Sequence, residues 1–220
     1  MDAPQTVEQF KAEAGKAGAV VHHALTIEDA YSYILKLVQE RNIRTIVTSK
    51  SELLDKLDLR ARLSETGITV KDTDLNKWLG PPKSGEPAEL QVLLESVNRP
   101  LRQSCIDADL GISEAHNAIA ETGTLVIAGN DGFTRLVAVL PGLHLTLIEC
   151  KNIIPAMEDV FIKIGGNARK RTGQVVPSYI TYITGRNTTA DIPGAVLARA
   201  QGPAEEHIVL VGSADEGGVT

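Results

Sequence analysis

The feature that most constrains the fold is a regular alternation of short aliphatic runs with amphipathic stretches in the first third of the chain. Residues 19–25, 44–48 and 67–71 combine aliphatic residues or Thr with flanking turn residues, as strands do. Between them, 27–38 and 51–65 carry apolar residues at helical spacing. Such alternation predicts an open, mainly parallel, doubly wound α/β sheet.

The second half of the chain continues this pattern, with a core that must rest on Leu, Ile, Val and Ala because only 4% of the residues are aromatic. Aliphatic strands of this kind suit a parallel sheet that is buried on both faces. We expect further strands at 105–110, 124–128, 143–149, 178–184 and 208–212, helices at 113–120 and 153–164, and a polar loop at 185–194.

We predict one α/β domain over residues 1–220. Residues 1–18 are expected to form an N-terminal helix. Residues 73–103 are expected to be an irregular insertion, because the Pro/Gly-rich stretch 78–87 is incompatible with a strand, with a further short helix over 88–97. Residues 213–220 are expected to be a mobile tail.

Charge and cysteine usage narrow the class of protein. The formal charge of -6 and the sequence pI of about 5.4 argue against nucleic-acid binding, which depends on basic side chains. Cys105 and Cys150 form no Cys-x-x-Cys motif and lie in or beside apolar segments, so we expect reduced core thiols and no metal site. No stretch reaches the ~18 apolar residues of a membrane span. Without a secretory signal at the N-terminus, a cytoplasmic protein is expected.

The segment 120–124, Ala-Glu-Thr-Gly-Thr, places a carboxylate and two hydroxyls beside a buried strand. Glu121 is expected to be desolvated there, and Gly123 lets the backbone turn or lets a ligand approach. Thr122 and Thr124 can donate and accept hydrogen bonds. Two interpretations remain open, a structural cap or ion pair on the one hand and a ligand-binding or catalytic site on the other.

Two other segments carry candidate site residues. His144, within the strand expected at 143–149, is either a hydrogen-bonded core residue or a general base. In the polar loop, Arg186 either binds a substrate carboxylate or phosphate or pairs with Asp191 to hold the loop. The candidate ligand-binding residues of this loop are Gly185, Arg186, Thr188, Thr189 and Asp191.

Three segments in order resemble motifs of the lactate-utilisation protein C family, the LUD-domain proteins. Residues 108–126 resemble the family's central motif, and residues 140–146 its Leu-Pro-x-x-His segment. Residues 183–192 resemble its late loop ending in Ala-Asp-Ile, and Gly202-Pro203 the Gly-Pro that follows. At 186–188, Arg-Asn-Thr stands where many relatives carry Pro-Ser and a further small or polar residue.

The resemblance implies a fold like that of sugar-phosphate isomerases and coenzyme A transferases. It implies a component of an L-lactate oxidation system that works beside an iron–sulfur protein and a further redox subunit, with no cofactor in this chain. Coenzyme A transferases use a glutamate nucleophile, so the alternative is a free-standing enzyme or sensor that binds a small phosphorylated or acyl ligand at Glu121. Whether the chain is itself an enzyme stays open, and a small carboxylate or phosphate is the expected ligand.

Overall fold

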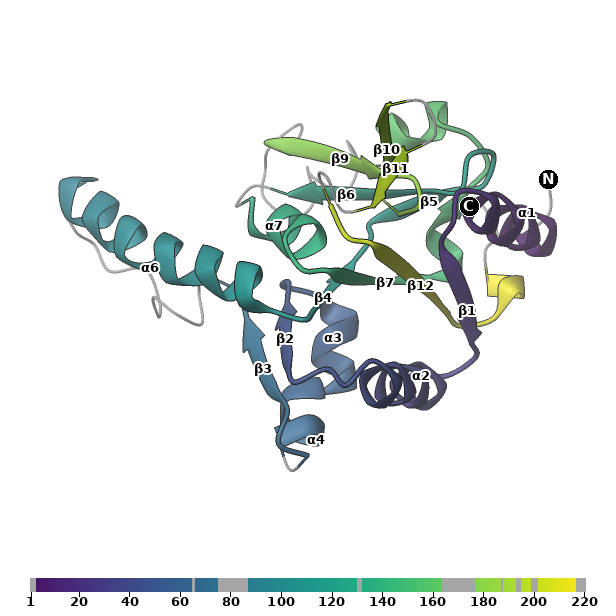
Figure 1. Cartoon of the computed structure of the whole chain (residues 1–220). Coiled ribbons are helices and arrows are strands. Elements are labelled where there is room, and N and C mark those ends of the chain that lie inside the picture. The colour runs from purple at the N-terminus through teal and green to yellow at the C-terminus, as the bar shows by residue number, and fades with distance from the viewer. Residues whose placement is uncertain are drawn as a thin grey trace.

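A computed structural model describes residues 3–64, 66–74, 87–129, 132–163, 177–186, 188–192, 195–198 and 202–216. Its main element is a parallel sheet of β1 (Val20–Ala24), β2 (Thr45–Thr48), β3 (Thr69–Asp72), β4 (Leu110–Glu114), β7 (Leu143–Glu149) and β12 (Glu205–Val211). The strands lie in the order β1-β12-β7-β4-β2-β3, and each neighbouring pair is parallel (Figure 1). The predicted open, mainly parallel α/β fold is confirmed.

One face of this sheet, which we call the outer face, is covered by α2 (Ile27–Glu40), α3 (Glu52–Leu57) and α4 (Leu59–Ser64). Thr26 and Asp29 form a capping box that fixes the start of α2. The helix expected at 51–65 is divided because Asp58 adopts a left-handed φ of 47°, which ends α3. Apolar residues of these helices pack against strand residues of the outer face such as Ile112, Leu145 and Val209.

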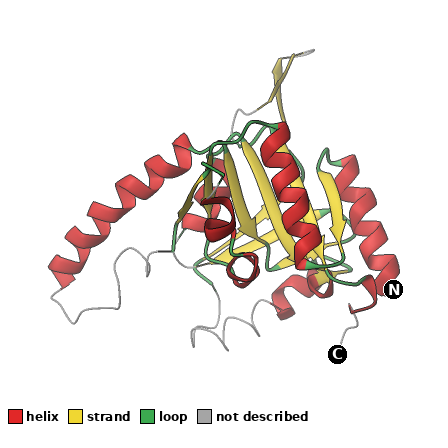
Figure 2. Cartoon of the chain, turned by 90° about the horizontal axis from the view of Figure 1, so that it is seen from below, coloured by secondary structure: helices red, strands yellow, loops and turns green. Residues whose placement is uncertain are grey.

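The opposite face, the inner face, is covered by α1 (Ala3–Lys16), α7 (Phe133–Val139) and a second sheet. That sheet contains β8 (Ile153–Ile154), β5 (Asn117–Ile119), β6 (Thr124–Gly129) and β9 (Tyr179–Ile183), in the order β8-β5-β6-β9. Val7 and Phe10 of α1 pack with Leu125 of β6 and with Ile208 and Leu210 of β12. In Figure 2 helices lie in front of the main sheet, on its outer face, and further strands lie behind it.

The remaining elements are α6 (Pro87–Asp107), the hairpin of β10 (Thr188–Ile192) and β11 (Ala195–Ala198), and the short helices η1 (Cys150–Asn152) and η2 (Ala214–Glu216). In both views α6 extends away from the two sheets (Figures 1 and 2). Its C-terminal turns contact β2 and α7, and Leu101 and Cys105 are buried there. Among the helices that the structure describes, none is both long enough and apolar enough to cross a membrane.

Several expected elements of the second half are wrong. The strand expected at 105–110 is the end of α6, and the strand begins only at Leu110. The helix expected at 113–120 is instead the end of β4 followed by β5, because the small side chains Ala115, Ala118 and Ala120 are buried in the core that α1 shares with the two sheets. Tertiary packing therefore overrides the helix propensity of alanine.

Other differences concern the segments around the motifs. The irregular insertion expected at 73–103 contains most of α6, while 75–86 lie outside the described residues. The strand expected at 178–184 is present as β9, but it pairs with β6 in the second sheet rather than closing the main one. The loop expected at 185–194 contains β10. The helix expected at 153–164 begins as β8, and only 158–163 are described as helical. Of the expected tail, 214–216 form η2 and 217–220 lie outside the described residues.

Candidate functional site

Glu121 lies in an exposed turn between β5 and β6, so the desolvated carboxylate that we expected is wrong. Its Oε1 accepts a hydrogen bond of 2.9 Å from the backbone N–H of Met157, and its own N–H donates to the carbonyl of Pro155. Met157 directly precedes the helical residues 158–163. The carboxylate therefore occupies the position of a helix cap, where it satisfies a free backbone donor.

The threonines of the same motif form a chain of hydroxyls that reaches the late segment. Thr122 donates to Thr124 over 2.7 Å, and Thr124 lies 2.8 Å from the hydroxyl of Thr184. This contact follows from the pairing of β6 with β9, in which Leu125 faces Ile183. Two of the three motif segments thus meet in the second sheet.

Gly123 and Gly185, both proposed as ligand-binding residues, lie against the C-terminal end of α1. Each adopts a left-handed φ, 63° and 65° respectively. A β-carbon at Gly123 would collide with the backbone of Ala14, and one at Gly185 with the backbone of Ala17. The close approach that we expected of a ligand is therefore made here by the protein's own helix.

Arg186 is exposed, and its side chain lies beside Gly18, just after α1. Thr188, Thr189 and Asp191 belong to β10, but their side chains lie outside the described part of the structure. Their contacts with a ligand, and the pairing of Asp191 with Arg186, therefore stay predictions.

His144 lies on a different element, β7, in a buried network on the inner face of the main sheet. Its Nδ1 is 2.8 Å from Glu206 Oε2, and its Nε2 is 2.9 Å from Ser113 Oγ. Thr146 donates to the second oxygen of Glu206 over 3.1 Å. None of the four side chains is more than 1% exposed. Sequence reasoning identified His144 but missed Ser113, which falls at the start of the helix expected at 113–120, and Glu206, which belongs to no motif.

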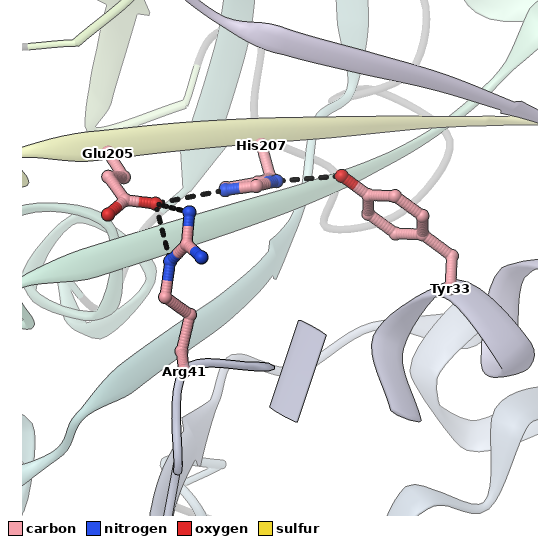
Figure 3. Close-up of polar contacts among 4 residues, drawn as sticks. All are labelled: Tyr33, Arg41, Glu205 and His207. Atoms are coloured by element: carbon pink, nitrogen blue, oxygen red, sulfur yellow. Dashed lines mark hydrogen bonds and ion pairs between the residues drawn. The ribbon is translucent and has the colours of Figure 1, made fainter. Parts of the chain in front are cut away.

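A second network lies on the outer face, at the amino end of β12 (Figure 3). Tyr33 Oη is 2.7 Å from His207 Nδ1, and Arg41 donates from Nε and Nη2 to Glu205 Oε2. His207 Nε2 approaches the same carboxylate oxygen at 3.4 Å. His22 stacks on the ring of Tyr33, with the ring centroids 4.2 Å apart. This network ties the last turns of α2 to β12.

Burial and hydrogen bonding shift the pKa values in this outer network. Burial is the main cause that lowers the pKa of His207 and raises that of Tyr33. The hydrogen bond from Arg41 lowers the pKa of Glu205 and raises that of Arg41 itself. The network therefore favours a neutral imidazole beside an ionised Arg–Glu pair.

A third polar group lies at the carboxyl ends of β2 and β4. Ser51 donates to Glu114 over 2.6 Å, and this carboxylate also accepts from the N–H of Leu53 in the first turn of α3. Lys50 lies 3.6 Å from Asp74, which follows β3. In open α/β sheets, ligands bind at this edge, where the strand order reverses.

The two cysteines are free and buried, as predicted. Within the described ranges, no group of three or more His, Cys, Asp and Glu side chains is arranged to hold a metal ion. Burial raises the pKa of the Cys105 thiol to about 11, so this residue stays a protonated thiol at neutral pH.

Together, these features define an open α/β protein with a parallel main sheet and a smaller sheet packed on its inner face. The chain belongs to the LUD domain family, whose model matches residues 7–211. The family resemblance of the three motifs is thereby confirmed.

Curated relatives carry the name "Lactate utilization protein B", whereas the motifs suggested protein C. The protein from Bacillus licheniformis is 29% identical, over 93% of this chain and 47% of its own length. Those of Shouchella clausii and Bacillus subtilis are each 28% identical, over 93% and 92% of this chain and 48% and 47% of their own. The chain thus spans about half the length of the curated relatives that it matches.

Among solved structures, a DUF162 family protein from Deinococcus radiodurans is similar with a TM-score of 0.59 and 16% identity. The match covers 96% of this chain and 99% of that one. At this level of identity the likeness supports the fold alone.

Proposed function

We propose that the chain is a component of an L-lactate oxidation system and that it carries no iron–sulfur cluster itself. The observation that carries this proposal is the match to proteins named for lactate utilisation, which extends over 93% of the chain. The match to the family model over residues 7–211 supports the same role.

The cysteines support a division of labour between subunits. An iron–sulfur cluster is usually held by four cysteine thiolates, whereas this chain has two cysteines in all. Both are buried, and Cys105 is held as a thiol. The clusters that carry electrons from lactate would therefore belong to an iron–sulfur partner, with a further redox subunit beside it, and this chain would contribute a site for a small carboxylate.

Deletion of the gene tests the proposal in the source organism. We expect the deletion strain to lose growth on L-lactate as sole carbon source, to grow normally on glucose, and to recover on L-lactate when the intact gene is restored. We also expect a neighbouring gene for a cysteine-rich protein with cluster-binding motifs. Unimpaired growth of the deletion strain on L-lactate would contradict the role.

The alternative, a free-standing enzyme or sensor with a ligand at Glu121, has less support. The Glu121 carboxylate accepts the Met157 N–H in an exposed turn, and α1 fills the space beside Gly123. These contacts favour a structural role for the motif.

A further inference from the structure

A row of polar side chains crosses three adjacent strands, β12, β7 and β4, on the inner face of the main sheet. Glu206 of β12 is level with His144 of β7, and Thr146 of β7 is level with Ser113 of β4. In parallel strands, residues that are level with one another project from the same face, and so do residues two apart. Ser113, His144, Thr146 and Glu206 therefore lie side by side, and their hydrogen bonds link three strands.

The hydrogen bonds are compatible with one continuous order of donors and acceptors. In this order, Glu206 accepts the Nδ1–H of His144 and the hydroxyl hydrogen of Thr146. With Nδ1 protonated, a neutral imidazole has its lone pair on Nε2, which accepts the hydroxyl hydrogen of Ser113 over 2.9 Å. This is the order nucleophile, base and orienting carboxylate by which enzymes activate a serine.

The serine of this row also lies where ligands enter open α/β sheets. From β2 the chain continues to β3 on one side and later returns to β4 on the other, so the order of strands reverses between β2 and β4. The β2–β3 connection runs through α3 and α4 on the outer face, whereas α6 leads into β4 and packs against Val47 on the inner face. Ser113 is the next-to-last residue of β4, at the carboxyl end of this pair.

Ser49 supplies an independent observation at the same place. It follows β2 directly and donates its backbone N–H to Ile112, which continues the register and sets Ser49 level with Ser113 on the inner face. Its side chain is 2% exposed, and among the residues that the structure describes its hydroxyl has no hydrogen-bond partner. Buried hydroxyls are nearly always paired, so this one points to a missing ligand group.

We propose that Ser113 is an activated nucleophile that accepts an acyl group from a small ester or thioester, an activity separate from the role in lactate oxidation. Ser113 Oγ forms a bond to the carbonyl carbon while its proton moves to His144 Nε2. The bond from that carbon to the leaving oxygen or sulfur then breaks, and the leaving group takes the proton from His144. Glu206 orients the imidazole, and the Ser49 hydroxyl donates to the carbonyl oxygen.

Burial sets the expected rate of this reaction. Ser113 and His144 have no exposed surface, and the backbone of Val137 in α7 lies directly over Gly111, the inner-face neighbour of Ser113 in β4. A reagent therefore reaches Ser113 only after local opening of the layer above the sheet. We expect reaction to be slower than at an exposed active-site serine.

The test uses the full chain and a small alkyl fluorophosphonate, which forms a stable adduct with activated serines and leaves ordinary serines unmodified. We expect one adduct per chain in the intact mass, mapped to Ser113 by peptide mass spectrometry. The absence of an adduct on the folded wild-type chain, or an adduct at another residue, would overturn the proposal and leave the row as a structural tie between strands.

Matched variants separate activation from packing. Ser113→Ala should abolish the adduct, and His144→Gln and Glu206→Gln should slow its formation by about 100-fold or more. Ser104→Ala and His207→Gln are the controls. Ser104 is a buried serine that donates to the carbonyl of Pro100 and accepts from Lys71 Nζ, with no histidine among the partners that the structure describes, and His207 is a buried histidine on the outer face. Equal labelling rates in folded His144→Gln and wild type would contradict the proposal. If His144→Gln does not fold, the proposal is contradicted by equal labelling rates in Glu206→Gln and wild type, or by the absence of the wild-type adduct.

Discussion

Neighbours in sequence do not determine whether a single side chain is buried, and Glu121 illustrates this. It stands between the buried residues Ala120 and Gly123, yet its own side chain is exposed because the turn between β5 and β6 directs it outward to Met157. His144 is the opposite case, because its position in a strand of seven residues predicted burial. The sequence identified both as polar groups beside a core, but only the turn geometry separates them.

Removal of the Glu121 carboxylate should therefore affect stability. We expect Glu121→Ala to lower the free energy of unfolding by about 1 kcal/mol, as for the loss of a helix cap, and Glu121→Gln to lower it less because the amide oxygen still accepts. Denaturant unfolding measures both. Glu8→Ala, which removes only a surface pair with Lys11, is the control and should change little. A Glu121→Gln variant of full stability that has lost ligand binding would instead favour a catalytic role.

The outer network should make stability depend on pH. The folded-state pKa of His207 is lowered from 6.5, mainly by burial, so below about pH 6.5 the unfolded chain takes up a proton before the folded chain does. Stability should therefore be complete above pH 6.5 and fall on acidification, by at most about 1.4 kcal/mol per pH unit for one proton. The pKa of His22 is lowered for the same main cause and adds to the effect.

Unfolding experiments between pH 7 and 5 check this, and His207→Gln should flatten the curve. The Arg41–Glu205 pair titrates in a separate window, because the pKa of Glu205 is lowered from 4.5 and its contribution is lost only in more acidic solution. An unchanged slope in His207→Gln would assign the dependence to other groups.

At the scale of elements, Gly123 and Gly185 contact the backbone at the C-terminal end of α1. Gly123 precedes β6 and Gly185 follows β9, so the paired strands bring both turns beneath the same helix. Phe10 and Ala14 of α1 are fully buried between the two sheets. The motif segments therefore determine how the N-terminal helix docks.

Gly123→Ala and Gly185→Ala test this docking. Each variant strains a left-handed residue and collides with α1, so we expect a loss of about 2–5 kcal/mol of unfolding free energy. Gly67→Ala is the control, because Gly67 has a φ of 76° but open space around it, and strain alone should cost about 1–2 kcal/mol. Hydrogen exchange should localise the extra loss to α1. Equal losses in all three variants would show that the close approach is unimportant.

Elements whose ends are marked by capping residues, Pro or Gly could be predicted from the sequence, whereas elements determined by tertiary contacts could not. Thr26 and Asp29 mark the start of α2, and Pro141-Gly142 precedes β7, so local chemistry sufficed there. Residues 113–119 have the composition of a helix, but in the fold they complete β4 and start the second sheet. The sequence of this segment contains no signal that residues 117–119 pair into a second sheet.

At the scale of the whole molecule, the alternation of strands and helices was sufficient for the fold class but not for the candidate site. Ser113 and His144 are separated by 31 positions, and His144 and Glu206 by 62, so their contacts depend on the strand order. That order places β12 next to β7, although β8, β9, β10 and β11 come between them in the sequence. Single-sequence patterns carry no information about such long-range neighbours.

The position of β12 between β1 and β7 also delays the pairing of β1 during synthesis. β1 is synthesised before its only neighbour in the described sheet, β12, which is formed by residues 205–211. Until then β1 has no hydrogen-bonding partner, and Val20, half exposed even in the finished fold, would lie on an open strand edge. Pairings over such sequence separations form slowly, so the edge of β1 is open to aggregation until β12 is made.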